Sequence, residues 1–232
     1  MDRYAEQPCS LSRRGAIAGL GVISLLLAGC GSKGGGSASK SPSAQAASSS
    51  RRATTGGGGS TVDLVVMIIR HAEKPVGNET GKDDTGRRDR HSLTERGWAR
   101  ANALPRLFDP RPAPGLVRPI KVYAASDRGQ DAGGHRMRQT VTPLAKRLGL
   151  AVDLDYAESK EADLAAAVSA SPGPVLICWE HSRIPAIVEA LAPQSGAPAT
   201  WPERFDLIWV LTRTAGTWSF NTVDEHLLDA DA

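Results

Sequence analysis

The sequence contains little cysteine, and this shortage excludes a domain held together by disulfides. Its 232 residues include three cysteines, of which Cys9 and Cys30 lie near the N-terminus. Cys178 stands alone in the apolar run 175–179, where a lone cysteine most often serves as a small buried hydrophobic residue. Because Cys178 is the only cysteine beyond that N-terminal segment, the domain can form no internal disulfide, and its fold is expected to depend on its hydrophobic core alone.

A large excess of one charge is also missing. The formal net charge is +3, and no long Lys/Arg stripe with interleaved aromatic residues is present. Such a stripe is the usual sign of a nucleic-acid-binding surface. Nucleic acid is therefore not an expected partner.

The histidine spacings that are typical of metalloenzymes are absent too. Neither HxH nor HExxH occurs, although His71, His181 and a carboxylate are residue types that hold zinc. The adjacent Arg70 would repel a cation. We therefore expect no metal and no other cofactor.

The first thirty residues have the pattern of an export signal. Arg13 and Arg14 precede a short apolar stretch, Ala16 to Ala28, which is followed by small residues. This arrangement predicts a signal peptide over residues 1–30, because the stretch is too short for a comfortable transmembrane helix.

Residues 26–30, Leu-Leu-Ala-Gly-Cys, resemble a bacterial lipobox. The resemblance implies cleavage before Cys30 and lipidation of its thiol. Ser12-Arg13-Arg14 resembles a twin-arginine signal, although Ala16 stands where a bulky apolar residue is usual, so the twin-arginine and general secretory routes both stay open. We expect an exported protein that is lipid-anchored to the outer face of the bacterial cell membrane, in a periplasmic or extracytoplasmic location.

Residues 31–60 consist mainly of Gly, Ser and Ala. Such a segment buries too little apolar surface to offset the entropy lost on ordering, and it predicts a flexible linker. Residues 61–232 then form one globular domain, which is long enough for a sizeable core.

Strand and helix patterns alternate along this domain. Apolar runs predict strands at 62–69, 120–125, 151–156, 174–179 and 206–212. Helices are expected from Thr94 to Pro105, at 136–148 with a kink or restart at Pro143, at 160–170 and at 184–191. Alternation of this kind predicts a three-layer α/β fold, whose mainly parallel sheet has helices on both faces. Residues 205–223 are expected to form a hairpin at the sheet edge, turning through Ala215-Gly216.

Charged residues follow several of these strands at their C-terminal ends. Arg70 and His71 follow the first strand, Arg136 opens the helix after the second, and Glu180-His181 follow the strand at 174–179. Ligands of open α/β sheets bind at this edge. Two arginines and two histidines suit an anion such as phosphate, since guanidinium binds two oxygens at once and a neutral imidazole can act as a nucleophile.

Four short motifs, in order, resemble the histidine phosphatase superfamily, which includes the phosphoglycerate mutase-like enzymes. They are Ile69-Arg70-His71-Ala72-Glu73, Leu93-Thr94-Glu95-Arg96-Gly97, Arg136-Met137-Arg138-Gln139-Thr140 and Trp179-Glu180-His181. The resemblance extends from Val62 to about Val210 and implies a phosphoglycerate mutase-like fold.

The resemblance also implies roles for individual residues. His71 would be the nucleophile that becomes phosphohistidine, while Arg70, Arg136 and His181 would hold the phosphoryl group. Glu158 lies near the place where many members carry the general acid, and Glu180 and Glu73 are alternatives for that role.

Two segments depart from the family pattern. The loop from Asp127 to His135 is longer than usual, so Arg128 or Arg138 could supply the second guanidinium in place of Arg136. The segment from Lys74 to His91 is long and charged, and it could cover the site or select an anionic substrate.

We therefore expect a phosphatase that hydrolyses a phosphoester or a phosphoramidate through a phosphohistidine on His71. Its partner would be an anionic phosphorylated small molecule or a phosphoprotein, and the sequence does not indicate an oligomeric state. The alternatives are a phosphomutase of the same family and a non-catalytic lipoprotein that binds phosphate or a phosphoprotein.

Overall fold

The computed structural model describes residues 62–129 and 134–231. The predicted signal peptide, the lipidation site Cys30 and the linker at 31–60 lie outside the described residues. Within the described part of the chain, no helix has both the length and the apolar character needed to span a bilayer.

A single six-stranded sheet, in the order β3-β2-β4-β1-β5-β6, organises the domain. The strands are β1 (Val62–Arg70), β2 (Lys121–Ala124), β3 (Val152–Asp153), β4 (Val175–Trp179), β5 (Leu207–Thr214) and β6 (Thr217–Asp224). Pairings β1–β4, β2–β4 and β2–β3 are parallel, whereas β5 runs antiparallel to both β1 and β6. The predicted mainly parallel sheet is confirmed.

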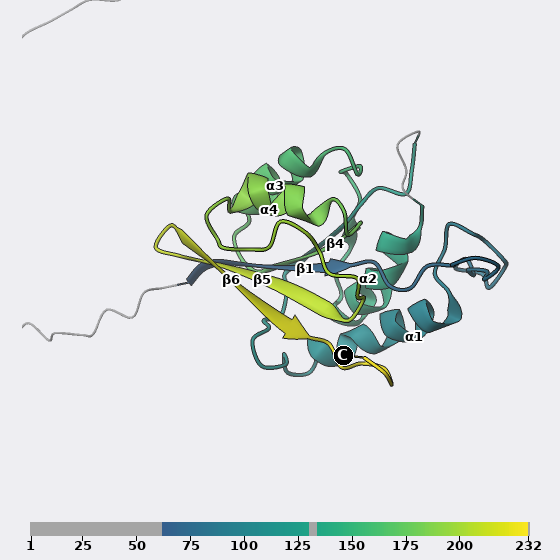
Figure 1. The fold of residues 1–232 in the computed structure, drawn as a ribbon. Helices are drawn as coiled ribbons and strands as arrows, with labels where there is room; N and C mark the ends of the chain where they lie inside the picture. The colour runs from purple at the N-terminus through teal and green to yellow at the C-terminus, as the bar shows by residue number, and fades with distance from the viewer. Residues whose placement is uncertain (1–61, 130–133, 232) are drawn as a thin grey trace, which may run out of the picture. The chain divides into compact units, whose positions relative to one another are not determined.

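Helices cover both faces of this sheet (Figure 1). Helices α3 (Glu161–Ser169) and α4 (Ile184–Leu191) lie on one side, and α1 (Glu95–Ala103) and α2 (Arg136–Leu148) lie on the other. A short 3-10 helix, η1 (Leu104–Leu107), continues α1. This arrangement is the predicted three-layer α/β architecture.

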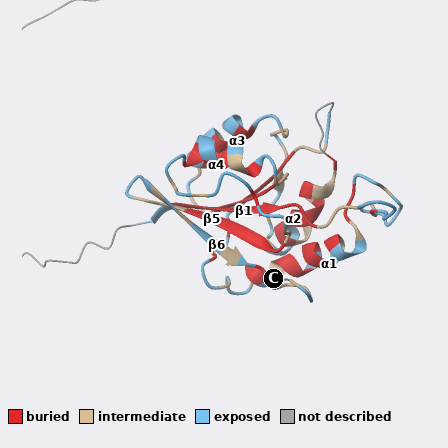
Figure 2. Cartoon of the chain, in the orientation of Figure 1, coloured by how far each residue is buried: buried red, intermediate tan, exposed pale blue. Residues whose placement is uncertain are grey.

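The central strand β1 is apolar along most of its length because both of its faces are covered. Val66, Met67 and Ile68 are fully buried, and Figure 2 shows this strand in the buried interior. Full burial of one such side chain contributes roughly 1.5–3 kcal/mol. A continuous apolar run is typical of a strand that is buried on both faces.

The predicted hairpin at the sheet edge is also confirmed. Strands β5 and β6 are joined at Ala215 and Gly216, which both have positive φ, 49° and 78°. Two consecutive residues with positive φ form the tight turn whose twist matches a two-stranded hairpin. Strand β6 is therefore an edge strand of the sheet, and five of its eight residues are exposed.

Two predicted details are wrong. The strand expected at 151–156 is only Val152–Asp153, because the Asp153 side chain accepts a hydrogen bond from the Asp155 amide and turns the chain away from the sheet. Of the kink or restart expected at Pro143, the restart does not occur, since α2 continues through the proline. The proline removes one backbone donor there, but the buried residues Val141 and Leu144 on either side of it hold the helix against the core.

Candidate active site

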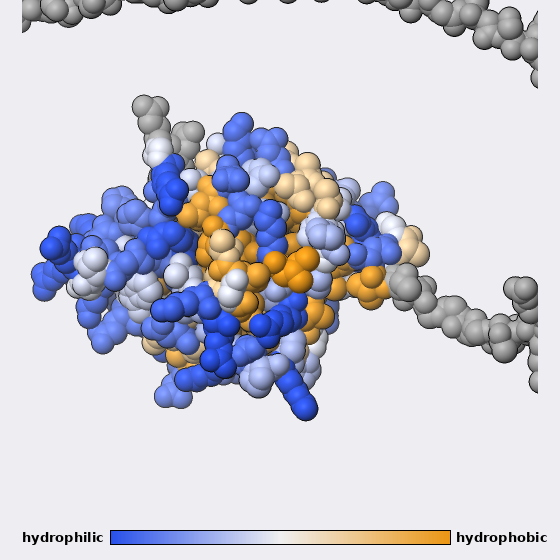
Figure 3. All heavy atoms as spheres, turned by 180° about the vertical axis from the view of Figure 1, so that it is seen from behind, coloured by the Kyte–Doolittle hydropathy of each residue, from blue (hydrophilic) through white to orange (hydrophobic). Residues whose placement is uncertain are grey.

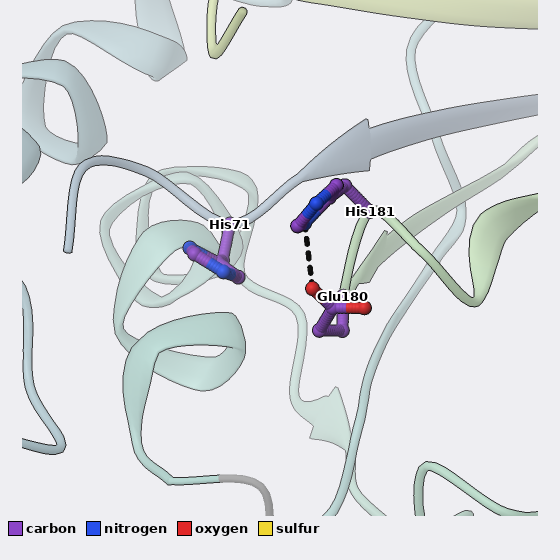
Figure 4. Close-up of side chains that lie close together, drawn as sticks. All are labelled: His71, Glu180 and His181. Atoms are coloured by element: carbon purple, nitrogen blue, oxygen red, sulfur yellow. Dashed lines mark ion pairs between the residues drawn. The ribbon is translucent and has the colours of Figure 1, made fainter. Parts of the chain in front are cut away.

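The candidate site lies at the edge of the sheet where parallel strands β1 and β4 end. Arg70, the last residue of β1, pairs in register with Trp179, the last residue of β4. The amide of His71 donates to the Trp179 carbonyl oxygen at 3.1 Å, so the two chains stay side by side as they leave the sheet. His71 and His181 are thereby brought together from distant parts of the sequence (Figure 4).

His71 is fully buried, and its tautomer follows from one hydrogen bond. Its Nδ1 lies 2.7 Å from the Ala72 carbonyl oxygen, which can only accept, so Nδ1 carries the hydrogen and donates it. Burial lowers the pKa of His71 to about 3, with the charges of Arg136 and Arg70 acting in the same direction. The imidazole is therefore neutral near pH 7, and the lone pair is on Nε2.

That Nε2 atom is buried and has no hydrogen-bond partner among the described residues. Leaving a buried polar atom unpaired is costly, and such atoms are rare in folded proteins. At the end of a strand in an α/β sheet, an unpaired imidazole nitrogen of this kind is available to a ligand.

Arg70 lies beside His71 and is held by an aromatic ring. Its side chain is 4% exposed, and its Cζ stands 4.0 Å from the centroid of the Phe205 ring. Burial lowers the pKa of this guanidinium, and Glu203 provides the largest opposing effect. The Nε and Nη1 atoms of Arg70 are buried without a hydrogen-bond partner in the described part of the chain, so they can donate to an anion.

Arg136 begins α2 and contributes a second positive charge to the same place. It is half-buried, and burial lowers the pKa of its guanidinium while Glu158 and Glu180 raise it. Its charge also lowers the pKa of His71. The structure therefore places Arg136 with Arg70 and His71.

Arg138 and Arg128, the alternative sources of a guanidinium, are placed differently. Arg138 forms ion pairs with Asp84 and Asp127 at 2.6 and 2.5 Å. Arg128 is exposed and adjoins residues 130–133, which lie outside the described part of the chain. Neither of them is among the charges that shift the pKa of His71.

His181 and Glu180 follow β4 and face His71 (Figure 4). The Nδ1 atom of His181 lies 2.6 Å from Glu180 Oε1, although the two are not aligned as a hydrogen bond. Burial raises the pKa of Glu180, but Ser182 hydrogen bonds and the His181 charge outweigh burial and leave that pKa below its usual value. Glu180 is therefore a carboxylate that stays ionised next to an imidazole.

The three candidate acids have different surroundings. Burial raises the pKa of Glu158, and the neighbouring Glu180 acts in the same direction while Arg136 opposes them. Glu73 is instead paired with Arg100, whose Nη2 lies 2.8 Å from Glu73 Oε1. Of the three, Glu158 is the carboxyl whose environment favours the protonated form.

The loop that carries His71 is fixed by α2. The amide of Ala72 donates to Thr140 Oγ1 at 2.9 Å, and that hydroxyl donates to the Arg136 carbonyl at 2.7 Å. Gln139 bonds the Leu93 amide and the Ser92 hydroxyl at 3.0 and 2.9 Å. Thr140 and Gln139 thus connect three of the four motifs through buried hydrogen bonds.

The Leu93–Gly97 motif supports the same loop from α1. Thr94 caps the helix by accepting from the Gly97 amide at 3.1 Å, and its own amide donates to the Glu73 carbonyl at 3.0 Å. A Cβ on Gly97 would stand 2.5 Å from that carbonyl oxygen. Glycine is therefore required where α1 approaches the backbone that follows His71.

Replacing Thr140 by valine is expected to lower the free energy of unfolding by about 1–3 kcal/mol, because the buried Ala72 amide loses its acceptor. Hydrogen exchange at Ala72 should accelerate in the same variant. Thr142→Val is a matched control, because Thr142 makes the same bond to the carbonyl four residues earlier, at 2.8 Å from Arg138 O. Chemical denaturation and amide exchange measure both effects, and equal losses in the two variants would contradict this role of Thr140.

One group of side chains in the described part of the chain has the geometry of a metal site. The ligand atoms of His71, Glu180 and His181 all lie within 4.8 Å of one another. The guanidinium of Arg70 next to them disfavours a divalent cation by charge repulsion. The positive charge of Arg70 favours an anion at this place instead.

Two residues at the site have no sequence signal. Phe205, which packs against Arg70, and Glu203, whose carboxylate lies 3.8 Å from Arg70 Nη1, come from the irregular segment between α4 and β5. Phe205 begins the expected hairpin at 205–223, but no motif marks either residue as part of a site. Only the antiparallel placement of β5 beside β1 brings the segment before β5 to the end of β1.

No protein family model matches the chain, and no curated protein matches it. Among solved structures, a mycobacterial glucosyl-3-phosphoglycerate phosphatase is similar with a TM-score of 0.46 and 14% identity, covering 69% of this chain and 98% of its own. The protein histidine phosphatase SixA, complexed with tungstate, has a TM-score of 0.46 and 17% identity, covering 69% of this chain and 97% of its own. A putative phosphohistidine phosphatase SixA from Nakamurella multipartitia has a TM-score of 0.43 and 18% identity, covering 71% and 96%. Because these TM-scores and sequence identities are low, the function is argued from the site itself.

Proposed function

We propose that this protein is a phosphatase that hydrolyses a phosphoester or a phosphoramidate through a phosphohistidine on His71. The observation that carries the proposal is the buried Nε2 of His71, which holds a lone pair and has no hydrogen-bond partner in the described part of the chain. A neutral imidazole is the form that acts as a nucleophile. Arg70 beside it supplies positive charge for a dianion.

In the first step His71 Nε2 attacks the phosphorus, and the bond from phosphorus to the leaving oxygen or nitrogen breaks. The leaving group takes up a proton as it departs. In the second step water attacks the phosphohistidine, the P–N bond breaks, and inorganic phosphate leaves with the imidazole neutral again. Splitting one displacement into two is the usual advantage of a covalent intermediate.

Arg70, Arg136 and His181 have the roles of binding and charge stabilisation. Guanidinium groups donate to two phosphoryl oxygens at once, and a histidine can donate to an oxygen whose charge grows in the transition state. Glu180 lies 2.6 Å from His181 Nδ1, and the opposite ring nitrogen, Nε2, is the atom of His181 that can donate toward the phosphoryl group.

Glu158 is our candidate for the general acid. A general acid must hold a proton at the working pH, and burial raises the pKa of Glu158. Glu180 is less suited, because its pKa lies below the usual value. Glu73 is occupied by its ion pair with Arg100.

We also propose that the domain acts outside the cytoplasm, anchored through a lipidated Cys30. The support is the sequence of residues 1–60, with its short apolar stretch, lipobox-like ending and Gly/Ser-rich continuation. Its substrate would then be a phosphorylated small molecule or phosphoprotein that reaches that compartment.

The direct test is to trap the intermediate. A brief reaction of the full-length protein with radiolabelled acetyl phosphate, quenched in alkali, is expected to leave one phosphoryl group on the peptide that contains His71. Phosphohistidine should survive alkali and disappear in acid. Turnover without a labelled His71 peptide would refute the mechanism, and phosphate binding without turnover or label would favour the non-catalytic alternative.

A further inference from the structure

The residue Glu203 places a negative charge at the mouth of the phosphate site. Its carboxylate oxygens lie 3.8 Å from Arg70 Nη1 and 3.9 Å from His181 Nε2. These are two of the groups that would hold the phosphoryl oxygens under the proposed function. Glu203 therefore lies close to both groups, whereas Glu180 is nearer to His181 and forms no ion pair with Arg70 among the described residues.

Glu203 is free to move, whereas the residues around it are fixed. Its side chain is 86% exposed. Trp201 is buried and stacks against Trp209 with ring centroids 4.8 Å apart, and Phe205 is held against Arg70. Glu203 thus projects from a short stretch that is anchored on both sides, and it can leave Arg70 when an anion binds.

The same carboxylate lines a pocket next to the phosphate site. This pocket has a volume of about 260 Å³, and it is lined by His181, Ser182, Pro185, Ala199, Thr200, Trp201 and Glu203. Because His181 belongs to both places, a group attached to the bound phosphate can extend into this pocket. Glu203 supplies the acidic charge that such a group would meet.

We propose that Glu203 determines specificity, by selecting phosphorylated compounds whose leaving group is cationic or uncharged over those that carry a second negative charge. The proposal rests on the proposed function and names the substrate class of that site. Before substrate binds, Glu203 neutralises part of the charge of Arg70. Burial lowers the pKa of Arg70, and the charge of Glu203 is the largest effect that raises it. After binding, the same carboxylate attracts a cation and repels an anion in the adjoining pocket.

The segment from residue 74 to residue 91 is rich in charged, exposed side chains. Figure 3 shows hydrophilic side chains over the end of the molecule that carries residues 74–91.

Two phosphonates of similar size test the proposal without any turnover. 2-Aminoethylphosphonate carries an ammonium group, phosphonoacetate carries a carboxylate, and neither P–C bond is open to hydrolysis at the site. The dissociation constants of both, and of inorganic phosphate, are measured by calorimetry with full-length wild-type protein and with Glu203→Gln at low ionic strength.

We expect the wild type to bind 2-aminoethylphosphonate more tightly than phosphonoacetate. In Glu203→Gln this preference should fall by about tenfold. The variant loses one unit of negative charge about 6 Å from the ligand group whose charge differs by two units between the two phosphonates. The change should shrink in 1 M salt, and inorganic phosphate should bind more tightly to the variant. Glu189→Gln, an exposed change of the same type in α4, should leave the preference unchanged.

An unchanged preference in Glu203→Gln would overturn the proposal, as would an equal change in Glu189→Gln or a wild type that binds none of the three anions. These results are distinct from a failure of the proposed function. A protein that shows the predicted preference but forms no phosphohistidine would keep the role of Glu203 in binding and lose only the catalytic step.

Discussion

Replacing His71 by alanine is expected to reduce turnover of a phosphomonoester by at least about a thousandfold, because the variant has no atom to accept the phosphoryl group. Inorganic phosphate should still bind within a few fold of the wild type, since Arg70, Arg136 and His181 remain. The measurement is kcat/KM together with the dissociation constant of phosphate. Loss of turnover with binding retained would separate a chemical role from a structural one.

The pH dependence strengthens this test. Burial lowers the pKa of His71 to about 3, so its imidazole remains neutral and nucleophilic from pH 5 to pH 8. The turnover of the wild type over that range should therefore show no acid limb that belongs to His71. His91→Ala, which removes an exposed imidazole, serves as the control. If His71→Ala turned over substrate nearly as fast as His91→Ala, the mechanism would be refuted.

Replacing Arg100 by alanine is expected to cost about 3–5 kcal/mol of unfolding free energy, the usual loss when one partner of a buried ion pair is removed. Arg100 is 4% exposed and contacts Glu73, Glu225 and Asp231 at 2.8, 3.1 and 2.7 Å. Without it these buried carboxyl groups would lose the donor that they share. Urea denaturation of the variant and the wild type measures the loss.

Arg96→Ala is the matched control, because Arg96 pairs with two of the same acids, Glu73 and Asp231, at 3.2 and 3.3 Å but is 46% exposed. Ion pairs of exposed side chains contribute about 0–1 kcal/mol, so its loss should be small. Similar losses in both variants would contradict the buried role of Arg100.

The loss in Arg100→Ala should also grow with pH. Burial raises the pKa of Glu225 to about 8, although Arg100 acts against this shift. Removing Arg100 raises the pKa of Glu225 in the folded state further above its value in the unfolded state. The folded state then binds more protons than the unfolded state, so the free energy of unfolding falls as pH rises. The difference from wild type should therefore be larger at pH 8 than at pH 5.5.

The order of the elements could be predicted from the sequence because each one has a strong local signal. The apolar run of β1 and the Ala215-Gly216 turn are set by neighbouring residues. The length of β3 could not be predicted in this way, since the Asp153 side chain competes with the sheet for a backbone amide. At Pro143 the local preference for a break is overcome by tertiary packing of α2.

The site could be predicted only in part, for a similar reason. Arg70 ends β1, His71 follows it directly and His181 lies just after β4, so the topology of a parallel sheet brings them together. Glu203 and Phe205 reach the site through a segment without regular structure. Arg100 contacts Asp231, which lies 131 positions away in the sequence, and no local pattern in the sequence encodes such a contact.

The reversed direction of β5 has a consequence for how this protein could change its substrate. Because β5 runs opposite to β1, its incoming segment, which carries Glu203 and Phe205, arrives where β1 ends. The nucleophile and its arginines come from other segments, at the end of β1 and the start of α2. Substitutions or insertions between α4 and β5 can therefore alter ligand preference while the phosphoryl-transfer residues stay in place, so the two properties can evolve separately.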